Sequence, residues 1–334
     1  MAKEVVLSGI RPTGFLHLGN YFGAMRNYVR MQNDYDCYFF VANWHALTTH
    51  PDSQTLKAAV HRVIAENIAC GLDPNKVCLY VQSDVPEIAE LYLYLNTMAY
   101  KGELEKTTTF KDKARQQPDN INAGLLTYPV LQAADILIHR AVKVPVGKDQ
   151  EQHLEMARTF AERFNYRYGD VFPLPFAFNY GGELIKILSL DGNGKMSKSE
   201  NQLATLYLAD DDALIRKKIM KAKTDEGPTK PNSPMPDYIE NLFTLMKIVS
   251  TKDVTEKFET DYNNSSKGNC VIRYGDMKKQ LAEDMVQFIA PIRAKATDLQ
   301  NNTQLLDNLI KQGADKARAS ASATLQLVRK VILG

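Results

Sequence analysis

Short apolar runs alternate with amphipathic stretches along the first half of the chain. Four runs are typical of buried parallel strands, and they lie at residues 4–8, 37–42, 76–82 and 143–147. Stretches with helical periodicity separate or follow them, at residues 19–32, 53–70, 86–100, 124–138 and 149–165. Ser53 is placed to cap the second of these helices, and Gly71 is placed to end it. This alternation predicts a parallel sheet covered by helices on both faces.

The pattern changes in two later regions. Residues 101–122 are polar and rich in lysine and arginine, which predicts a long loop, and loops of that length are usually functional or disordered. Residues 172–180 are expected to be irregular. Beyond residue 200 the periodicity is helical: a helix starts at the aspartate run 210–212, a linker with four prolines covers 224–236, and further helices are predicted at 237–249, 252–262, 275–298, 303–312 and 314–332. The sequence therefore predicts a domain of residues 1–200 and a helical domain of residues 201–334, with the last helices able to pack back on the first domain.

Composition narrows the class of protein. The chain has 334 residues, 44% hydrophobic and 24% charged, as in ordinary globular proteins, and no apolar run approaches the ~18 residues of a membrane helix. The first strand begins too early to leave room for a signal peptide. The four cysteines form no Cys-x-x-Cys pair, which favours reduced thiols in a cytoplasmic protein over disulfides or zinc. A net charge of +2 excludes a protein that coats nucleic acid by bulk charge.

Two short stretches far apart carry candidate chemistry. Residues 11–20, RPTGFLHLGN, end the first strand and start a helix, and such a junction presents backbone N–H groups and a positive helix end that suit phosphate. His17 precedes that helix with an imidazole that can donate to an anionic oxygen. Residues 195–199, KMSKS, place two lysines three apart in a loop, where they can follow charge that develops on a transferring phosphate.

Either stretch alone is common, since one is usually an ordinary turn and the other a solvated loop. Together they resemble the two signature motifs of class I aminoacyl-tRNA synthetases. His17-Leu18-Gly19-Asn20 resembles the His-Ile-Gly-His motif with Asn in the last place, and residues 195–199 match Lys-Met-Ser-Lys-Ser at every letter. The resemblance implies an α/β fold with a Rossmann-like, doubly wound parallel sheet as the catalytic domain. It also implies an all-helical C-terminal domain that binds the tRNA anticodon.

Asp135 stands out on the apolar helix at residues 124–138. A carboxylate in such a place needs a partner, because burying it alone is costly. It could pair with His139 one turn further on, or it could accept a hydrogen bond from a buried ligand. Tyr128 and Gln132 lie one to two turns before it on the same helix, and this cluster of polar groups favours a pocket.

Residues 128–137, YPVLQAADIL, closely resemble the amino-acid-binding helix of tryptophanyl-tRNA synthetases. Residues 144–153, VPVGKDQEQH, resemble the Val-Gly-Glu-Asp-Gln-x-x-His segment of the same family. Carried over residue by residue, the resemblance implies that Asp135 accepts the indole N–H. The other residues of the amino-acid site would be Tyr128 and Gln150 on the α-amino group, with Gln132 and His45 lining the pocket.

The same resemblance implies the ATP-binding residues. The ribose and adenine would lie on Gly147, Lys148 and Asp149, with Ile187 beside the base. The further ATP contacts would be Arg11, Pro12, Thr13, Gly19, Asn20 and the loop residues Lys195, Met196, Ser197, Lys198 and Ser199. The catalytic residues would be His17, Asn20, Lys113, Lys195 and Lys198. No protein metal site is implied, because Mg²⁺ would arrive with ATP.

Three positions depart from the family pattern. The family commonly has Gln where this chain has Arg11, Met where it has Gln132, and Glu where it has Lys148. Gln132 brings two donors and an acceptor that need partners, so the pocket is expected to be more polar, with Gln132 bonded to Asp135 or Arg11.

The predicted reaction is activation of L-tryptophan with ATP to tryptophanyl-adenylate, followed by transfer to tRNA(Trp), in a cytoplasmic homodimer. The side chains of Leu91, Leu93, Leu95 and Met98 are expected to offer an apolar surface for the second copy. Three alternatives stand beside this prediction. A tyrosyl-tRNA synthetase shares both signatures, although Ala-Ala-Asp-Ile at residues 133–136 points away from it. A nucleotidyltransferase is usually shorter and would lack residues 195–199, and a non-enzymatic RNA- or tryptophan-binding relative would be expected to have a degraded signature.

Overall fold

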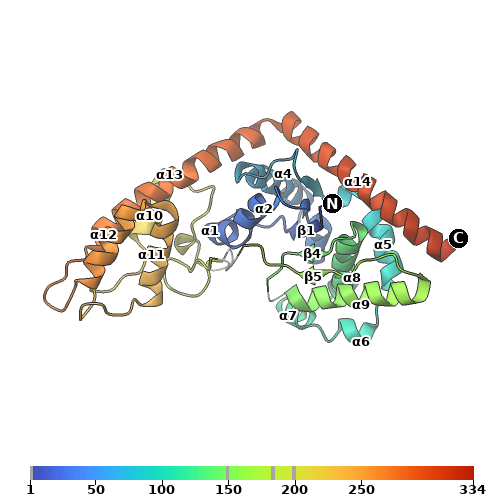
Figure 1. Ribbon diagram of the computed structural model, residues 1–334, viewed down its shortest axis with the longest axis horizontal. Helices are drawn as coiled ribbons and strands as arrows, with labels where there is room; N and C mark the ends of the chain where they lie inside the picture. The colour runs from blue at the N-terminus through green and yellow to red at the C-terminus, as the bar shows by residue number, and fades with distance from the viewer. Residues whose placement is uncertain (1–2, 148–149, 182–184, 198–200) are drawn as a thin grey trace. The chain divides into compact units, whose positions relative to one another are not determined.

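The computed structural model describes residues 3–147, 150–181, 185–197 and 201–334 (Figure 1). The chain divides into two compact units. Unit 1 comprises residues 1–13, 28–182 and 299–334, and unit 2 comprises residues 14–27 and 183–298. A single boundary at residue 200 does not describe this division, because residues 14–27 group with the second unit and the last helix groups with the first.

Unit 1 is built on a five-stranded parallel sheet with the order β3-β2-β1-β4-β5. Its strands are β1 (Val5–Ile10), β2 (Asp36–Val41), β3 (Cys78–Val81), β4 (Lys143–Val144) and β5 (Phe176–Ala177). The register pairs Val6 of β1 with Cys37 of β2, and Phe39 of β2 with Leu79 of β3. The four expected strands are confirmed. β5 was not expected: it lies in the stretch predicted to be irregular, it is only two residues long, and Pro173 and Pro175 interrupt the apolar residues before it.

Helices cover the sheet of unit 1 (Figure 1). They are α3 (Asn43–Ala46), α4 (Ser53–Ala69), α5 (Glu87–Asn96), α6 (Lys101–Leu104), α7 (Thr108–Gln116), α8 (Ala123–Ile138), α9 (Glu151–Tyr168) and α14 (Thr303–Leu333), with short 3-10 turns η2 (Leu47–Thr49) and η3 (Gln82–Asp84). One core joins Phe40 and Tyr80 of the sheet to the apolar faces of α5, α8, α9 and α14. The cap of α4 is Asp52, whose Oδ2 accepts the Thr55 N–H at 2.8 Å, and not Ser53 as the sequence had indicated.

The polar stretch at residues 101–122 is not a continuous loop, because it contains α6 and α7. Thr107 caps α7, and its hydroxyl accepts the Phe110 N–H. No residue of α7 is buried. The helix therefore has no apolar stripe, which is the pattern that a sequence reading of helices depends on.

Unit 2 is mainly helical outside the two signature stretches. Its helices are α10 (Asp212–Met220), α11 (Asp237–Val249), α12 (Lys252–Asn263) and most of α13 (Tyr274–Asn301), with η5 (Gln202–Ala204) before them. Asp211 caps α10, as the aspartate run predicted, and its Oδ1 accepts the Leu214 N–H at 2.7 Å. At the start of the chain, α1 (Leu18–Asn20), the π-helix η1 (Tyr21–Met25) and α2 (Arg26–Met31) follow one another without a gap. Among the described residues, no helix is long and apolar enough to cross a membrane.

The last helix is α14, a single helix of 31 residues that is not interrupted at Gly313. It contacts β3 and α5 within unit 1, and Figure 1 shows it beside α5. Gly313 sits against the backbone of β3: a Cβ built there would lie 1.7 Å from the Leu79 carbonyl oxygen. The Cys78 thiol also donates to the Gly313 carbonyl at 3.3 Å. The glycine is needed for close approach, and it does not end the helix.

We therefore expect Gly313→Ala to destabilise the protein, because the methyl group would push α14 away from β3. Overpacking of this kind costs about 1–3 kcal/mol, and roughly 2–4 °C in Tm for each kcal/mol in a chain of this size. Gly275→Ala in α13 is the matched control, since a Cβ there meets nothing within 4 Å. Thermal unfolding of the two variants measures the difference, and an unchanged Tm for Gly313→Ala would contradict the close contact.

Candidate functional site

A cavity of about 400 Å³ opens at the carboxyl edge of the unit 1 sheet, where ligands bind in doubly wound folds. We call it the sheet-edge pocket. It brings together eight of the predicted site residues: Arg11, His45, Lys113, Tyr128, Gln132, Asp135, Gly147 and Gln150. They come from the end of β1, from α3 after β2, from α7 and α8, and from the segment after β4.

Asp135 lines this pocket with its side chain fully buried. The Nε2 atom of His45 lies 2.8 Å from its Oδ2, and the Gln82 amide donates to Oδ1 at 2.8 Å and to Oδ2 at 3.0 Å. Burial raises the pKa of Asp135, and the hydrogen bonds from His45 and Gln82 oppose that rise. The pocket thus contains a carboxylate held by donors, which an N–H of a ligand can also reach.

His139 is not the partner of Asp135, although it stands one helical turn away. Its Nε2 bonds the Tyr80 hydroxyl at 2.9 Å, and its Nδ1 bonds the Ser320 hydroxyl of α14 at 3.1 Å. Burial lowers the pKa of His139 to about 3, so the ring is neutral at physiological pH. Its role is to join α8 to β3 and α14.

Gln82 is a site residue that the sequence did not single out. It is fully buried immediately after β3, and besides holding Asp135 its Oε1 accepts the Trp44 N–H at 3.0 Å. Its only sequence signal is its position at a strand end. His153 is a second such residue: its Nε2 bonds the Thr109 hydroxyl at 2.9 Å and also the Tyr128 hydroxyl.

Lys113 reaches the sheet-edge pocket from α7, with its Nζ 4.2 Å from the centre of the Tyr128 ring. Burial, and to a smaller extent the nearby charge of Arg11, together lower the pKa of Lys113 to about 8. A lysine in this state is charged at neutral pH and is only weakly solvated, so an anion placed beside it gains more than it would at the surface.

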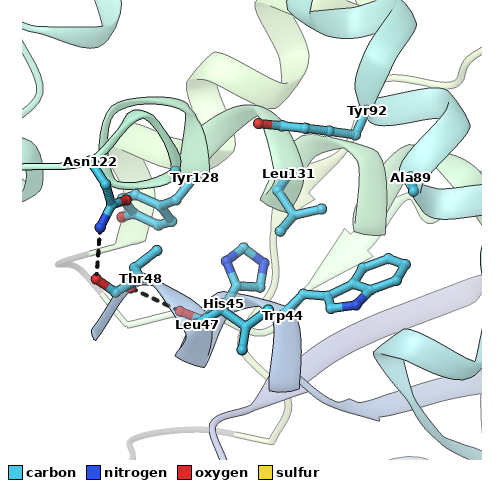
Figure 2. Close-up of a pocket in the computed structure, with 10 residues that line it drawn as sticks. Trp44, His45, Leu47, Thr48, Ala89, Tyr92, Asn122, Tyr128 and Leu131 are labelled. Atoms are coloured by element: carbon cyan, nitrogen blue, oxygen red, sulfur yellow. Dashed lines mark hydrogen bonds between the residues drawn. The ribbon is translucent and has the colours of Figure 1, made fainter. Parts of the chain in front are cut away.

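A second cavity of about 330 Å³ shares His45 and Tyr128 with the first (Figure 2). Figure 2 shows the His45 imidazole among the side chains of Trp44, Leu131 and Tyr128. Asn122 donates to the Thr48 carbonyl at 3.2 Å, and Thr48 donates to the His45 carbonyl at 3.0 Å. These bonds tie α3, which carries His45, to the start of α8.

The helix surface expected to face a second copy is mostly internal. Leu91, Leu95 and Met98 are buried in the core of unit 1, and only Leu93 is exposed, at 63%. The apolar pattern of these residues reflects packing within the chain.

The first signature stretch lies in unit 2, apart from residues 11–13. His17 caps α1: its Nδ1 accepts the Asn20 N–H, and the Asn20 Oδ1 accepts the His17 N–H, both at 3.3 Å. Because Nδ1 accepts, the ring is neutral and its proton is on Nε2, which is the tautomer that can donate to an anionic oxygen.

The lysine stretch also lies in unit 2, on a hairpin. Lys195 pairs with Leu188, the Met196 N–H donates to the Ile187 carbonyl at 3.0 Å, and Gly192 and Gly194 have φ of 77° and 73°. A Cβ on Gly19 would lie 3.4 Å from the Met196 carbonyl oxygen, so the two signatures are neighbours. The Ser197 hydroxyl is buried and has no hydrogen-bond partner among the described residues. The close approach at Gly19, which we call the Gly19 cradle, and the buried Ser197 hydroxyl fit a phosphate ligand.

Two further predicted residues, Pro12 and Thr13, come shortly after β1. Pro12 is buried after β1, and the Thr13 N–H donates to the Arg11 carbonyl at 2.8 Å. The residues that lie outside the described part of the chain are Lys148, Asp149, Lys198 and Ser199. No group of three or more histidine, cysteine or acidic side chains is arranged to hold a metal ion within the described ranges.

A parallel sheet with a buried acceptor at its carboxyl edge, together with the His17 and lysine stretches, defines an aminoacyl-tRNA synthetase of class I. The family described as tRNA synthetases class I (W and Y) matches residues 2–290, and the chain belongs to this family.

Individual relatives narrow the substrate. The chain is 57% identical over 330 residues to the tryptophan–tRNA ligase of Porphyromonas gingivalis, covering 98% of this chain and 99% of that one. It is 40% identical to the tryptophan–tRNA ligase of Clostridium acetobutylicum, covering 98% and 97%. The crystal structure of Campylobacter jejuni tryptophanyl-tRNA synthetase complexed with ADP and tryptophan is 33% identical, with a TM-score of 0.86 and 98% of each chain covered. The chain is an enzyme that ligates tryptophan to tRNA at the expense of ATP.

The electrostatic effect of Arg11 on Lys113 can be tested directly. Arg11→Gln is expected to raise the pKa of Lys113, because it removes a neighbouring positive charge that disfavours the ammonium form. Arg11→Lys keeps that charge and should leave the pKa near 8. NMR titration of the protein after reductive ¹³C-methylation of its lysines measures both, and equal pKa values in the two variants would contradict the interaction.

Proposed function

We propose that the sheet-edge pocket is the tryptophan site of this tRNA ligase and that Asp135 is its selector. The observation that carries the proposal is the buried carboxylate held by His45 and Gln82. An ionised carboxylate can only accept, so it suits the indole N–H, which phenylalanine lacks. Tyr128 and Gln150 hold the α-amino group, while Gln132 and His45 line the pocket.

ATP occupies the residues assigned to it by resemblance, and the Mg²⁺ it uses arrives bound to the nucleotide. Support comes from the neutral His17, from the Gly19 cradle and from the buried Ser197 hydroxyl in unit 2. Lys113 and Arg11 in the sheet-edge pocket add positive charge. The family resemblance assigns the ribose and adenine to Gly147, Lys148 and Asp149, and it assigns Ile187 to the base.

The reaction then follows from positioning and charge. The tryptophan carboxylate attacks the α-phosphate, the bond to the β-phosphate breaks, and pyrophosphate leaves. The lysines stabilise charge that builds up in the transition state, which is where such interactions accelerate a reaction. The 2′-hydroxyl of the terminal adenosine of tRNA(Trp) next attacks the adenylate, and AMP leaves.

The proposal extends to the protein's partners and setting. The helices of unit 2 read the tRNA anticodon, and the protein acts as a homodimer, for which the exposed Leu47 and Leu93 of unit 1 offer apolar contacts. A cytoplasmic location agrees with the free thiols of Cys37, Cys70, Cys78 and Cys270.

Lys195→Ala should lower kcat for tryptophan-dependent pyrophosphate exchange by about 10²–10³ while KM for tryptophan stays nearly constant, because the lysine acts on transition-state charge. The sequence predicts the same for Lys198→Ala. The control is Lys186→Ala, because Lys186 is an exposed lysine directly before the hairpin. A variant that mainly raised KM for tryptophan with kcat intact would show that the assigned role is wrong.

Asp135→Ala should lose tryptophan activation by about 10²-fold or more with little change in KM for ATP, since an unpaired indole N–H and two orphaned donors are left in the pocket. Gln132→Met is the parallel variant, because its amide could also meet the indole N–H. Pyrophosphate exchange with tryptophan, tyrosine and phenylalanine compares the two. If Asp135→Ala keeps its specificity and Gln132→Met does not, the selector is Gln132.

A further inference from the structure

Residues 205–210 of unit 2 contact both signature stretches, and we call them the linking segment. Leu206 and Leu208 pair with the first stretch: the Leu18 N–H donates to the Leu206 carbonyl at 3.0 Å, and the Leu208 N–H donates to the Leu16 carbonyl at 2.9 Å. His17 and Tyr207 form an antiparallel bridge between these bonds. The cap residue of α1 is therefore held by the backbone of the linking segment.

Thr205 makes the connection to the lysine stretch. Its side chain is buried, and its hydroxyl lies 3.0 Å from the Ser197 carbonyl oxygen and 3.2 Å from the Asn201 carbonyl oxygen. These two acceptors flank Lys198 in the sequence. The Thr205 hydroxyl thus contacts the backbone at Ser197 and at Asn201, on either side of Lys198 in the sequence. The next residue, Leu206, already pairs with the first signature stretch.

A buried ion pair holds the linking segment itself. The Lys218 ammonium donates to Asp210 Oδ2 at 2.7 Å and to the Thr205 carbonyl at 2.8 Å, and its side chain is only 4% exposed. Asp210 Oδ2 also accepts the Tyr207 N–H at 2.9 Å, and Arg293 donates to the Asp210 carbonyl. Buried pairs add little net stability because desolvation offsets their attraction, but separating the partners is costly because it leaves a buried charge uncompensated.

We propose that the linking segment couples the two signature stretches, and that Thr205 is a positioning residue that holds the lysine loop in register with His17. The inference rests on the proposed role of that loop in ATP chemistry. Ser197 is the residue through which it acts: Thr205 binds the carbonyl of Ser197, and the Ser197 hydroxyl is the buried group left for a ligand. Loss of the Thr205 hydroxyl frees the Ser197 backbone without removing any group proposed to touch ATP.

The first test is Thr205→Val, which keeps the shape of the side chain and removes the hydroxyl. Tryptophan-dependent pyrophosphate exchange should show kcat lowered by ~10- to 100-fold and KM for ATP raised, since misplacement of about 1 Å can cost that much. KM for tryptophan should stay within about twofold because the proposed tryptophan site lies in unit 1 and keeps its contacts. Thr205→Ser restores the hydroxyl and should restore kcat.

Thr255→Val is the matched control for a general effect of removing a buried threonine hydroxyl. Thr255 is also buried in unit 2, and its hydroxyl also donates to a backbone carbonyl at 3.1 Å, that of Thr251, the residue before α12. This variant should leave kcat and both KM values unchanged. If Thr205→Val does not fold, Thr205→Ala removes the hydroxyl without placing a new methyl group against the two carbonyls, and the same comparison applies.

The outcomes separate the coupling from the proposed function. If Lys195→Ala loses kcat while a folded Thr205→Val keeps kcat and KM for ATP, the coupling is wrong and the ATP role of the loop stands. If Lys195→Ala itself keeps kcat, the proposed function of the loop fails. A drop in Tm for Thr205→Val with unchanged kinetics, or a loss that Thr205→Ser does not restore, would also overturn the positioning role.

Discussion

The buried carboxylate of Asp135 determines how the elements of unit 1 must meet. An ionised carboxylate costs several kcal/mol to bury unless donors replace its water. Its donors come from two neighbouring strand ends: His45 stands on the helix after β2 and Gln82 follows β3 directly. Parallel strands end at one edge of the sheet, so this topology can gather the donors around a helix laid across that edge. The fold of unit 1 and the selectivity that we propose for the pocket therefore depend on the same hydrogen bonds.

The sequence predicted those parts of the protein whose determinants are local. β1 to β4 were recognisable because strands buried on both faces are continuously apolar. The bounds of α11 were predicted to the residue, since its buried face has a strong helical period and prolines precede it. Asp135 could be singled out because a carboxylate on an apolar helix is costly without a partner. Each of these features can be judged within one element.

The features that were missed depend on partners far away in the sequence. Gln82 gains its role from a carboxylate 53 residues later, and the only local signal is its position at the end of a strand. Gly313 was interpreted as a break between two helices, because glycine usually ends a helix, but it is retained in α14 for contact with β3, 235 residues earlier. α7 buries no residue and so lacks a stripe, although it carries Lys113 into the pocket. The insertion of residues 14–27 into unit 2 is likewise a property of tertiary contacts.

The two units use different structural means for two tasks with different physical requirements. Rejecting the wrong amino acid requires polar groups whose positions are fixed before the substrate arrives, and the groups that we propose for this task lie on α8 and at strand ends of unit 1. Stabilising a migrating charge requires cations that can follow it, and Lys195 lies on a hairpin whose two left-handed glycines permit a tight turn. The backbone of such a loop must still be held in a fixed position relative to the residues around the phosphate. In our proposal, the buried Thr205 hydroxyl and the buried Asp210–Lys218 ion pair hold the loop backbone from within unit 2. The exposed Lys195 side chain remains free to move.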